Sequence, residues 1–220
     1  MQRGPSLPAR RKAARAGASP LPRLARKSDI LNRAMQLIDE RGFANLSLGD
    51  IADEIGIKRE GLYYYYKNRF DILLAIVTPT AGELVSGLKD ILKQDVPPDV
   101  KLRRAIENHL IRFERAHTQT RIALRDTYFQ ENEEVLSKMR PIWEGYGDLW
   151  IRLVREGQKR KVFRSDIDAR VAAFGILGMC NWISRWYNPK KRIGVRELID
   201  SYSNLALGGM QANGGRASLR

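Results

Sequence analysis

The sequence predicts an all-α fold. From residue 28 onward, apolar residues recur at intervals of three and four positions, which places them on one face of a helix. No run rich in valine, isoleucine and threonine alternates with polar residues between turn signals, so no sheet is expected. Glycine, proline and capping residues divide the chain into about nine helices, arranged as an N-terminal three-helix domain and a larger helical domain.

The first two helices are delimited by capping residues. Apolar positions at helical spacing cover residues 28–41, and Gly42 follows as a C-terminal stop. Ser47 is a suitable N-cap for a short helix of Leu48–Ile55, because its hydroxyl can accept a backbone N–H of the first turn. Gly56 can adopt the left-handed conformation that ends such a helix.

The remaining helices follow in close succession. A third helix is expected from Arg59 to Tyr66. Asn68 is the expected N-cap of a fourth helix, which continues to about Lys93 with a kink at Pro79. The segment QDVPPD then breaks the pattern. Beyond it, helical periodicity predicts further helices at about residues 99–117, 120–130, 133–160, 167–188 and 195–208.

The chain is strongly basic. Its 220 residues carry a formal net charge of +14 and give a pI of about 10.1, an excess that favours a polyanionic partner such as nucleic acid. Residues 1–27 contain eight basic residues, four prolines and no acidic residue. We expect them to form a disordered basic tail that touches phosphates. The alternative is a solvated extension with no specific role.

Cysteine and histidine usage gives no sign of catalysis. Cys180 is the single cysteine, so a reducing cytoplasm is the expected compartment, and its apolar surroundings predict a buried, inert thiol. His109 and His117 are expected on one helix, but a metal site wants three or four ligands. No glycine-rich elbow accompanies a nucleophile. We therefore expect no metal, no cofactor and no enzymatic activity. No apolar run is long enough to predict a membrane span.

A helix-turn-helix is predicted for residues 46–66, where a tight glycine-containing turn separates two short helices. Its small core is expected to comprise Ile51, Ala52, Ile55, Ile57, Leu62 and Tyr66. The exposed first turn of the second helix is the part of a recognition helix that reaches base edges, and it comprises Lys58, Arg59, Glu60 and Gly61. A packed helical hairpin that touches no DNA is the alternative.

Four consecutive tyrosines close this unit. Leu62 and Tyr66 are four residues apart and share the inward face, which turns Tyr63, Tyr64 and Tyr65 sideways and outward. A tyrosine hydroxyl can donate to a phosphate, and its ring can pack on a sugar or a thymine methyl. The pattern therefore predicts double-stranded DNA as the partner, with the tyrosines flanking the groove.

The segment RGFANLSLGDIADEIGIKREGLYYYYKNRFDILL, Arg41–Leu74, resembles the DNA-binding signature of the TetR family of transcriptional regulators. The strongest positions of that signature are matched by Asp50, Ile51, Ala52, Gly56, Leu62, Tyr63 and Tyr65. The resemblance implies DNA contacts by Ser47, Lys58, Arg59, Gly61, Tyr63, Tyr64, Tyr65, Lys67 and Arg69. Two departures weaken the start of the recognition helix, because Lys58 replaces the usual serine cap and Glu60 replaces the usual glycine.

The same resemblance implies a two-part regulator that works as a homodimer. Residues 28–74 would bind a near-palindromic operator, and residues 75–210 would bind a small-molecule effector and the second subunit. Such a regulator is typically a repressor that the effector releases from DNA. The alternative from another class is a sequence-tolerant architectural DNA-binding protein without an effector, whose binding would depend on salt rather than on sequence.

The segment GILGMCNWISRWYNPKKR, Gly175–Arg192, resembles the corresponding part of TetR-type regulators that respond to acyl-coenzyme A thioesters. Trp182 and Trp186 are four apart and share a helix face, with Arg185 beside them. Indole and guanidinium groups suit an adenine and the phosphates of coenzyme A. The candidate ligand residues are Arg125, Trp182, Arg185 and Trp186. The alternative is that the tryptophan pair belongs to the dimer core.

The dimer interface is predicted on the last two helices, as a four-helix bundle formed by both subunits. On the first of them the expected stripe comprises Ala172, Gly175, Ile176, Met179, Ile183 and Trp186. On the second it comprises Leu198, Ile199, Tyr202, Leu205 and Ala206.

Overall fold

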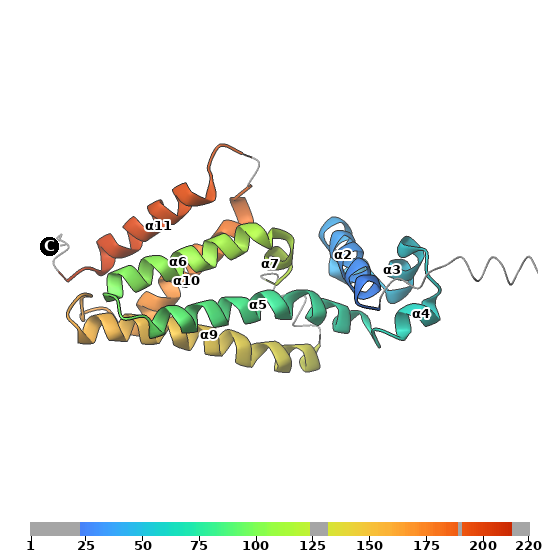
Figure 1. The fold of residues 1–220 in the computed structure, drawn as a ribbon, viewed down its shortest axis with the longest axis horizontal. Helices are drawn as coiled ribbons and strands as arrows, with labels where there is room; N and C mark the ends of the chain where they lie inside the picture. The colour runs from blue at the N-terminus through green and yellow to red at the C-terminus, as the bar shows by residue number, and fades with distance from the viewer. Residues whose placement is uncertain (1–22, 124–131, 189–190, 213–220) are drawn as a thin grey trace, which may run out of the picture.

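The computed structural model describes residues 23–123, 132–188 and 191–212. Regular structure in these ranges is helical, apart from an isolated bridge between Phe163 and Gln211. The predicted all-α class is therefore confirmed. Figure 1 shows an elongated bundle with the short helices α3 and α4 at one end of the molecule.

The N-terminal elements are α2 (Arg23–Arg41), the 3-10 turn η1 (Phe43–Asn45), α3 (Leu48–Ile55), α4 (Arg59–Tyr63) and α5 (Arg69–Lys93). Helix α2 begins at Arg23, so residues 23–27 of the predicted disordered tail are helical; residues 1–22 lie outside the described ranges. Helix α4 ends at Tyr63 rather than at Tyr66. The backbone N–H groups of Tyr65 and Tyr66 both donate to the Leu62 carbonyl, at 2.9 and 3.0 Å, and this tighter turn ends the helix.

The larger domain consists of α6 (Pro98–Arg115), α7 (His117–Ala123), α9 (Glu133–Lys159), α10 (Ala169–Trp186) and α11 (Val195–Met210). His109 and His117 do not share a helix as predicted, because Ala116 leaves the helical conformation (φ −115°, ψ 42°) and ends α6 before α7 begins. Residues 124–131, where the second half of the predicted 120–130 helix falls, lie outside the described ranges.

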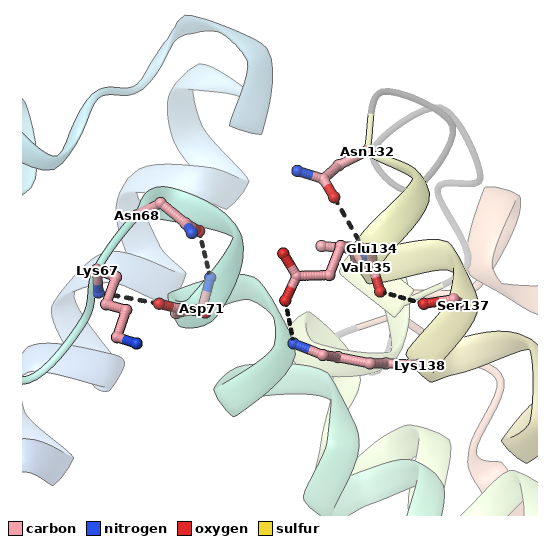
Figure 2. Close-up of polar contacts among 8 residues, drawn as sticks. All are labelled: Lys67, Asn68, Asp71, Asn132, Glu134, Val135, Ser137 and Lys138. Atoms are coloured by element: carbon pink, nitrogen blue, oxygen red, sulfur yellow. Dashed lines mark hydrogen bonds and ion pairs between the residues drawn. The ribbon is translucent and has the colours of Figure 1, made fainter.

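Asparagine caps begin the two longest helices. The Asn68 side chain accepts the backbone N–H of Asp71 at 3.0 Å at the start of α5, and Asn132 accepts that of Val135 at 3.1 Å at the start of α9. The Asp71 carboxylate accepts a further bond from the backbone N–H of Lys67 at 2.9 Å. Helices α5 and α9 pack together, and Figure 2 shows their first turns facing each other.

Two apolar cores lie along the molecule, and α5 runs through both. The N-terminal core joins α2, α3, α4 and the first half of α5 to residues of α7 and α9, and its fully buried members include Ile30, Leu37, Ile38, Phe43, Ile51, Leu62, Ile72 and Leu73. The C-terminal core joins the second half of α5 to α6, α9, α10 and α11 around Leu88, Ile106, Phe113, Trp150, Cys180 and Ile183. One continuous helix therefore connects the two halves of the protein.

Helix α5 also corrects one expectation. By length and composition alone it passes as a possible membrane span, although no apolar run was expected to do so. Its buried residues are shared between the two cores, and it contacts α2, α6, α7 and α9. Packing on four neighbouring helices is typical of the core helix of a helical bundle.

Candidate nucleic-acid interface and effector domain

The helix-turn-helix has the geometry that its sequence predicts. Ile51, Ala52, Leu62 and Tyr66 are buried between α2, α3, α4 and α5. Gly56 ends α3 with φ 70° and ψ 33°, a left-handed conformation that a side chain would strain. The backbone N–H of Ile57 donates to the Ala52 carbonyl at 3.0 Å. These contacts fix the angle between α3 and α4.

Ser47 is confirmed as the N-cap of α3. Its hydroxyl accepts the backbone N–H of Asp50 at 3.1 Å, and the Asp50 carboxylate accepts the backbone N–H of Ser47 at 2.8 Å. The Ser47 hydroxyl also donates to this carboxylate at 2.7 Å. These hydrogen bonds hold the pKa of Asp50 below its usual range. A DNA contact by Ser47 would have to coexist with this capping box.

The first turn of α4 is exposed, as expected of a recognition helix. Lys58 is its N-cap residue, and its side chain makes no capping hydrogen bond. Arg59, Glu60 and Gly61 follow on the exposed surface, and Lys67 is exposed in the turn before α5. The helix start is held instead by the Lys58 carbonyl, which accepts the backbone N–H of Gly61 at 2.9 Å. The three cations thus lie on one end of the domain, accessible to a polyanion.

The four tyrosines are exposed and buried as predicted, although α4 ends at the first of them. Tyr63 and Tyr64 have 56% and 67% of their surface exposed, Tyr65 is half-buried, and Tyr66 is buried at 4%. The rings of Tyr64 and Tyr65 meet edge to face, with centroids 5.1 Å apart. Burial raises the pKa of Tyr66 to about 12. Tyr66 therefore anchors the core, whereas Tyr63 and Tyr64 are exposed at the end of α4.

Arg69 has a structural role that the sequence did not indicate. Its Nη1 donates to the carbonyls of Phe43, Ala44 and Leu46, at 3.3, 2.9 and 3.3 Å. Its guanidinium also lies over the rings of Phe43 and Phe70. Arg69 thus ties the first turn of α5 to η1. A phosphate contact by Arg69, which the resemblance implies, would have to use its other N–H groups.

Glu54 is a further residue that the sequence did not single out. Its carboxylate pairs with Arg33 and, at 3.2 Å, with Arg41. The hydrogen bond and charge of Arg33 are the largest causes that lower the pKa of Glu54. These contacts attach α3 to α2 behind the exposed turn. No local pattern could reveal them, because the partners are separated by more than three helical turns of sequence.

The exposed apolar face of α10 coincides only in part with the predicted stripe. Ala172, Ile176 and Ile183 point into the C-terminal core and are buried. The residues of α10 that face outward are Val171, Phe174, Gly175, Gly178, Trp182 and Trp186, of which Gly175 and Trp186 belong to the predicted stripe; Leu205 is exposed on α11. We call this set of residues the α10 face. Both sides of α10 are apolar, so periodicity alone could not show which one the chain itself covers.

The candidate ligand residues lie mainly on this face. Trp182 is 63% exposed, Trp186 is 46% exposed, and Arg185 is exposed beside them. The Trp186 ring meets that of Tyr187, whose hydroxyl donates to Glu114 at 3.4 Å. Arg125 lies outside the described residues. The candidate ligand residues other than Arg125 therefore form an outward-facing aromatic and basic group, rather than the lining of an interior cavity.

A polar cluster lies inside the C-terminal core. The Nδ1 of His109 is 3.1 Å from the Tyr146 hydroxyl, and the two rings stack. Burial lowers the pKa of His109 to about 4 and raises that of Tyr146 beyond its usual range. Burial also raises the pKa of Cys180 to about 12, as expected of an inert thiol. His109 is therefore neutral at physiological pH.

We expect this histidine to make folding acid-sensitive. Its pKa rises from about 4 in the folded chain toward 6.5 on unfolding, so the unfolded state binds more protons between these values. The free energy of unfolding should fall by about 2 kcal/mol between pH 7 and pH 5 from this group alone. Urea unfolding at both pH values measures the loss. The His109→Gln variant should lack this part of the pH dependence; an unchanged difference would contradict the assignment.

Comparison with known proteins agrees with this geometry. Residues 30–76 match the family model "Bacterial regulatory proteins, tetR family", and residues 95–210 match "Tetracyclin repressor-like, C-terminal domain". The HTH-type transcriptional repressor KstR2 of Rhodococcus jostii is 24% identical over 186 residues, covering 84% of this chain and 91% of that protein. The fatty acid metabolism regulator protein of Bacillus subtilis is 24% identical over 185 residues, covering 82% and 93%.

A solved structure shows the same fold. The crystal structure of AibR in complex with isovaleryl coenzyme A and operator DNA superposes with a TM-score of 0.72 at 23% identity, covering 81% of this chain and 96% of that chain. The C-terminal family model alone matches more than half of the 220 residues. The chain therefore belongs to the TetR family of transcriptional regulators, which are DNA-binding proteins rather than enzymes.

Proposed function

We propose that this protein is a cytoplasmic repressor that binds a near-palindromic operator as a homodimer and is released by a small-molecule effector. The observation that carries the proposal is the exposed turn at the start of α4, where Lys58 and Arg59 lie beside Tyr63 and Tyr64. Two such turns related by a two-fold axis would enter successive major grooves, roughly 34–36 Å apart. The cations and tyrosine hydroxyls would contact phosphates and base edges.

The α10 face supports the homodimer. It places two tryptophans, a phenylalanine and a valine on the surface of a single helix. Contiguous apolar patches of this kind mark interfaces in soluble proteins, and tryptophan and phenylalanine are enriched at the centre of such interfaces. Gly175 and Gly178 lie between the aromatic residues and would allow close approach of a second helix. The same face on another subunit is the simplest complement.

We propose an acyl-coenzyme A thioester as the effector. Trp182 and Arg185 are exposed at one end of α10, and Lys191 and Arg192 follow in the next turn. An indole can stack on adenine, and the cations can pair with phosphates. A relative of the same fold was crystallised with isovaleryl coenzyme A and operator DNA, and another similar protein is a fatty acid metabolism regulator. The first name includes an acyl-coenzyme A, and the second refers to fatty acid metabolism.

The two halves of the chain are packed closely enough for an effector to act on the DNA-binding end. Ile122 of α7 and Val135 and Met139 of α9 are buried in the N-terminal core. Arg121 of α7 pairs with Asp39 of α2 at 3.4 Å. A shift of α7 or α9 would therefore move α2 and α5 directly. An effector that binds the shifted arrangement more tightly would release DNA.

At the start of α9, charged groups face those of α5. Glu134 pairs with Lys138 at 2.6 Å, and Figure 2 shows this pair opposite the Asn68–Asp71 cap. Lys67 adds to the lowering of the Glu134 pKa, after the larger effect of Lys138, and Asp71 adds to the raising of the Lys138 pKa, after that of Glu134. The exposed Lys67 beside the recognition helix is thus within electrostatic reach of the effector domain.

The proposed function is tested by two measurements on the full chain. Selection from a randomised double-stranded DNA library should yield a near-palindromic sequence. Acyl-coenzyme A esters of graded chain length should then release the protein from that sequence in a gel-shift titration. Binding that depends on salt without sequence preference would instead support an architectural DNA-binding protein. Sequence-specific binding that no ester releases would retain the repressor and reject the thioester.

We expect Arg185→Ala to keep operator affinity and to lose most of its response to the thioester. The guanidinium would supply one charge-assisted contact to a phosphate, and its removal should raise the effector concentration needed for release by about tenfold or more. The gel-shift titration measures the shift. The matched control is Arg155→Ala, which removes an exposed arginine from α9. Equal responses of the two variants would remove Arg185 from the proposed effector site.

A further inference from the structure

The guanidinium of Arg59 lies across helix α3. A Cβ atom built on Gly49 would be 2.8 Å from Nη2, 2.9 Å from Cζ and 3.1 Å from Nε of Arg59. These are the three nearest atoms, so the Arg59 side chain covers the position where Gly49 would carry its own. Arg59 is the first residue of α4. The side chain of Arg59, in the exposed turn of α4, therefore packs on the preceding helix over Gly49; we call this contact the Gly49 seat.

Glycine is an unfavourable choice at this position on helical grounds. Gly49 lies in the first turn of an eight-residue helix, where alanine or a straight-chain residue would favour the helix more strongly. Its backbone angles do not require glycine, because its φ is not among the positive ones. A larger residue at position 49 would instead collide with the Arg59 side chain, which occupies the space beside Gly49. The presence of a poor helix former in α3 thus has a steric explanation in the tertiary structure.

Asp53 adds an ion pair to the contact between Arg59 and α3. It lies four residues after Gly49 and therefore on the same face of α3, and its Oδ2 is 3.6 Å from Nη2 of Arg59. The two side chains are 69% and 65% exposed, so solvent screens the pair and its contribution to stability is small. The pair instead favours one direction of the long, flexible Arg59 side chain, the one in which it lies over α3.

We propose that Gly49 and Asp53 are positioning residues that hold Arg59 in the orientation with which it reads a base. This inference rests on the proposed function, in which Arg59 belongs to the base-contacting turn. The chemistry fits a guanine, because a planar guanidinium held in one direction can donate to both O6 and N7 in the major groove. A seated arginine also loses less rotamer freedom on binding. Neither Gly49 nor Asp53 needs to touch DNA for this effect.

The decisive variant is Gly49→Ala. The added methyl group meets the end of a flexible side chain rather than backbone, so the fold should be kept and Arg59 should move. Alanine also favours α3, so the midpoint of thermal unfolding should stay equal or rise. Preference for guanine at one position of the selected operator should nevertheless fall by about 3- to 10-fold, a part of what a full bidentate contact provides. A merely structural glycine would leave base preference unchanged.

Gly82→Ala is the matched control. Gly82 is an exposed glycine inside α5, and no atom lies within 4 Å of a Cβ built on it. The same substitution there should leave base preference as in the wild type. All variants are compared by sequencing the fraction of a randomised double-stranded DNA library that each retains. A preference profile of Gly49→Ala that coincides with that of Gly82→Ala would overturn the proposal.

The double variant separates this inference from the proposed function. Arg59→Ala alone should abolish the preference, and adding Gly49→Ala to it should change nothing further, because the group that Gly49 seats is absent. If Arg59→Ala keeps the wild-type preference, the base-reading assignment itself fails and the seat fails with it. If Arg59→Ala loses the preference while Gly49→Ala keeps it, Arg59 reads a base without the seat and only this inference is rejected.

Asp53→Asn tests the role of the ion pair between Asp53 and Arg59. Removing a carboxylate near DNA should raise affinity for non-specific duplexes, because one repulsion of phosphate is lost. Preference for guanine should fall, because Arg59 loses its partner. A rise in non-specific affinity together with a fall in guanine preference would show that Asp53 orients Arg59, because a change of charge alone would raise affinity without lowering the preference. Asp29→Asn, at an exposed position of α2, provides the control for charge alone, and a similar profile from both variants would contradict the role of Asp53.

Discussion

Trp182→Asp is expected to convert the protein to a monomer and to weaken operator binding by about 100-fold or more, because two half-sites would no longer be bound as one unit. Trp182 is 63% exposed on the α10 face and makes no part of the C-terminal core. The substitution should therefore spare the fold of the single chain. An aspartate buried in an apolar interface would have neither solvent nor a partner for its charge.

Analytical ultracentrifugation measures the loss of the dimer, and circular dichroism checks that the single chain remains folded. The sedimentation coefficient should fall to that of a monomer, and the helical signal should be unchanged. Trp182→Phe, which keeps an aromatic ring without a charge, is the control and should remain dimeric. A dimer of unaltered strength in Trp182→Asp would show that the α10 face is not the interface, and the tryptophans would then be available to the effector alone.

Lys101→Ala is expected to lower the free energy of unfolding by about 3 kcal/mol. Lys101 lies on α6 with its side chain only 6% exposed. Its ammonium donates to the Leu92 carbonyl at the end of α5, at 3.0 Å, and to Glu156 of α9, at 2.8 Å. Removing it leaves a carbonyl and a partly buried carboxylate with fewer partners. Arg160, 3.6 Å from Glu156, compensates only in part, because it is half exposed.

Chemical denaturation of the two lysine variants checks this effect. Lys93→Ala removes an exposed lysine whose Nζ is 3.2 Å from Asp90, and it should change stability by no more than about 0.5 kcal/mol. Lys101→Ala should be much less stable than this control, yet should retain the operator preference of the wild type. Equal stabilities would mean that the contacts of Lys101 with Leu92 and Glu156 contribute nothing net.

The α10 face and the contact of Arg59 with Gly49 concern different parts of one mechanism. The α10 face would set the distance between two DNA-binding ends, and the contact of α7 and α9 with the N-terminal core would let an effector change it. The seat of Arg59 on α3 would then determine which sequence that geometry prefers. Spacing and base preference are therefore separable, and variants of one should leave the other intact.

The sequence by itself determined the features that depend on neighbouring residues. Ser47, Gly56 and Asn68 were predictable as ends of helices, because a cap needs a hydrogen bond only two or three residues away or a particular local conformation. The burial of Tyr66 and the exposure of Tyr63 were predicted correctly as well, although α4 ends at Tyr63 and the turn that follows it, rather than helical spacing alone, places Tyr66 in the core. The resemblance to the TetR family also rested on positions close together in the sequence, among them Gly56, Tyr63 and Tyr65.

Only the tertiary structure decided where the longer-range partners lie. Arg69 reaches a carbonyl 25 residues before it, and Lys101 reaches a carboxylate 55 residues after it; no periodicity encodes such pairs. The predicted stripe of α10 mixes buried and exposed residues for a related reason. Burial inside one chain and burial between two chains select the same apolar residues. Which of the two applies depends on how neighbouring helices cover that side, and this is a property of the packed fold.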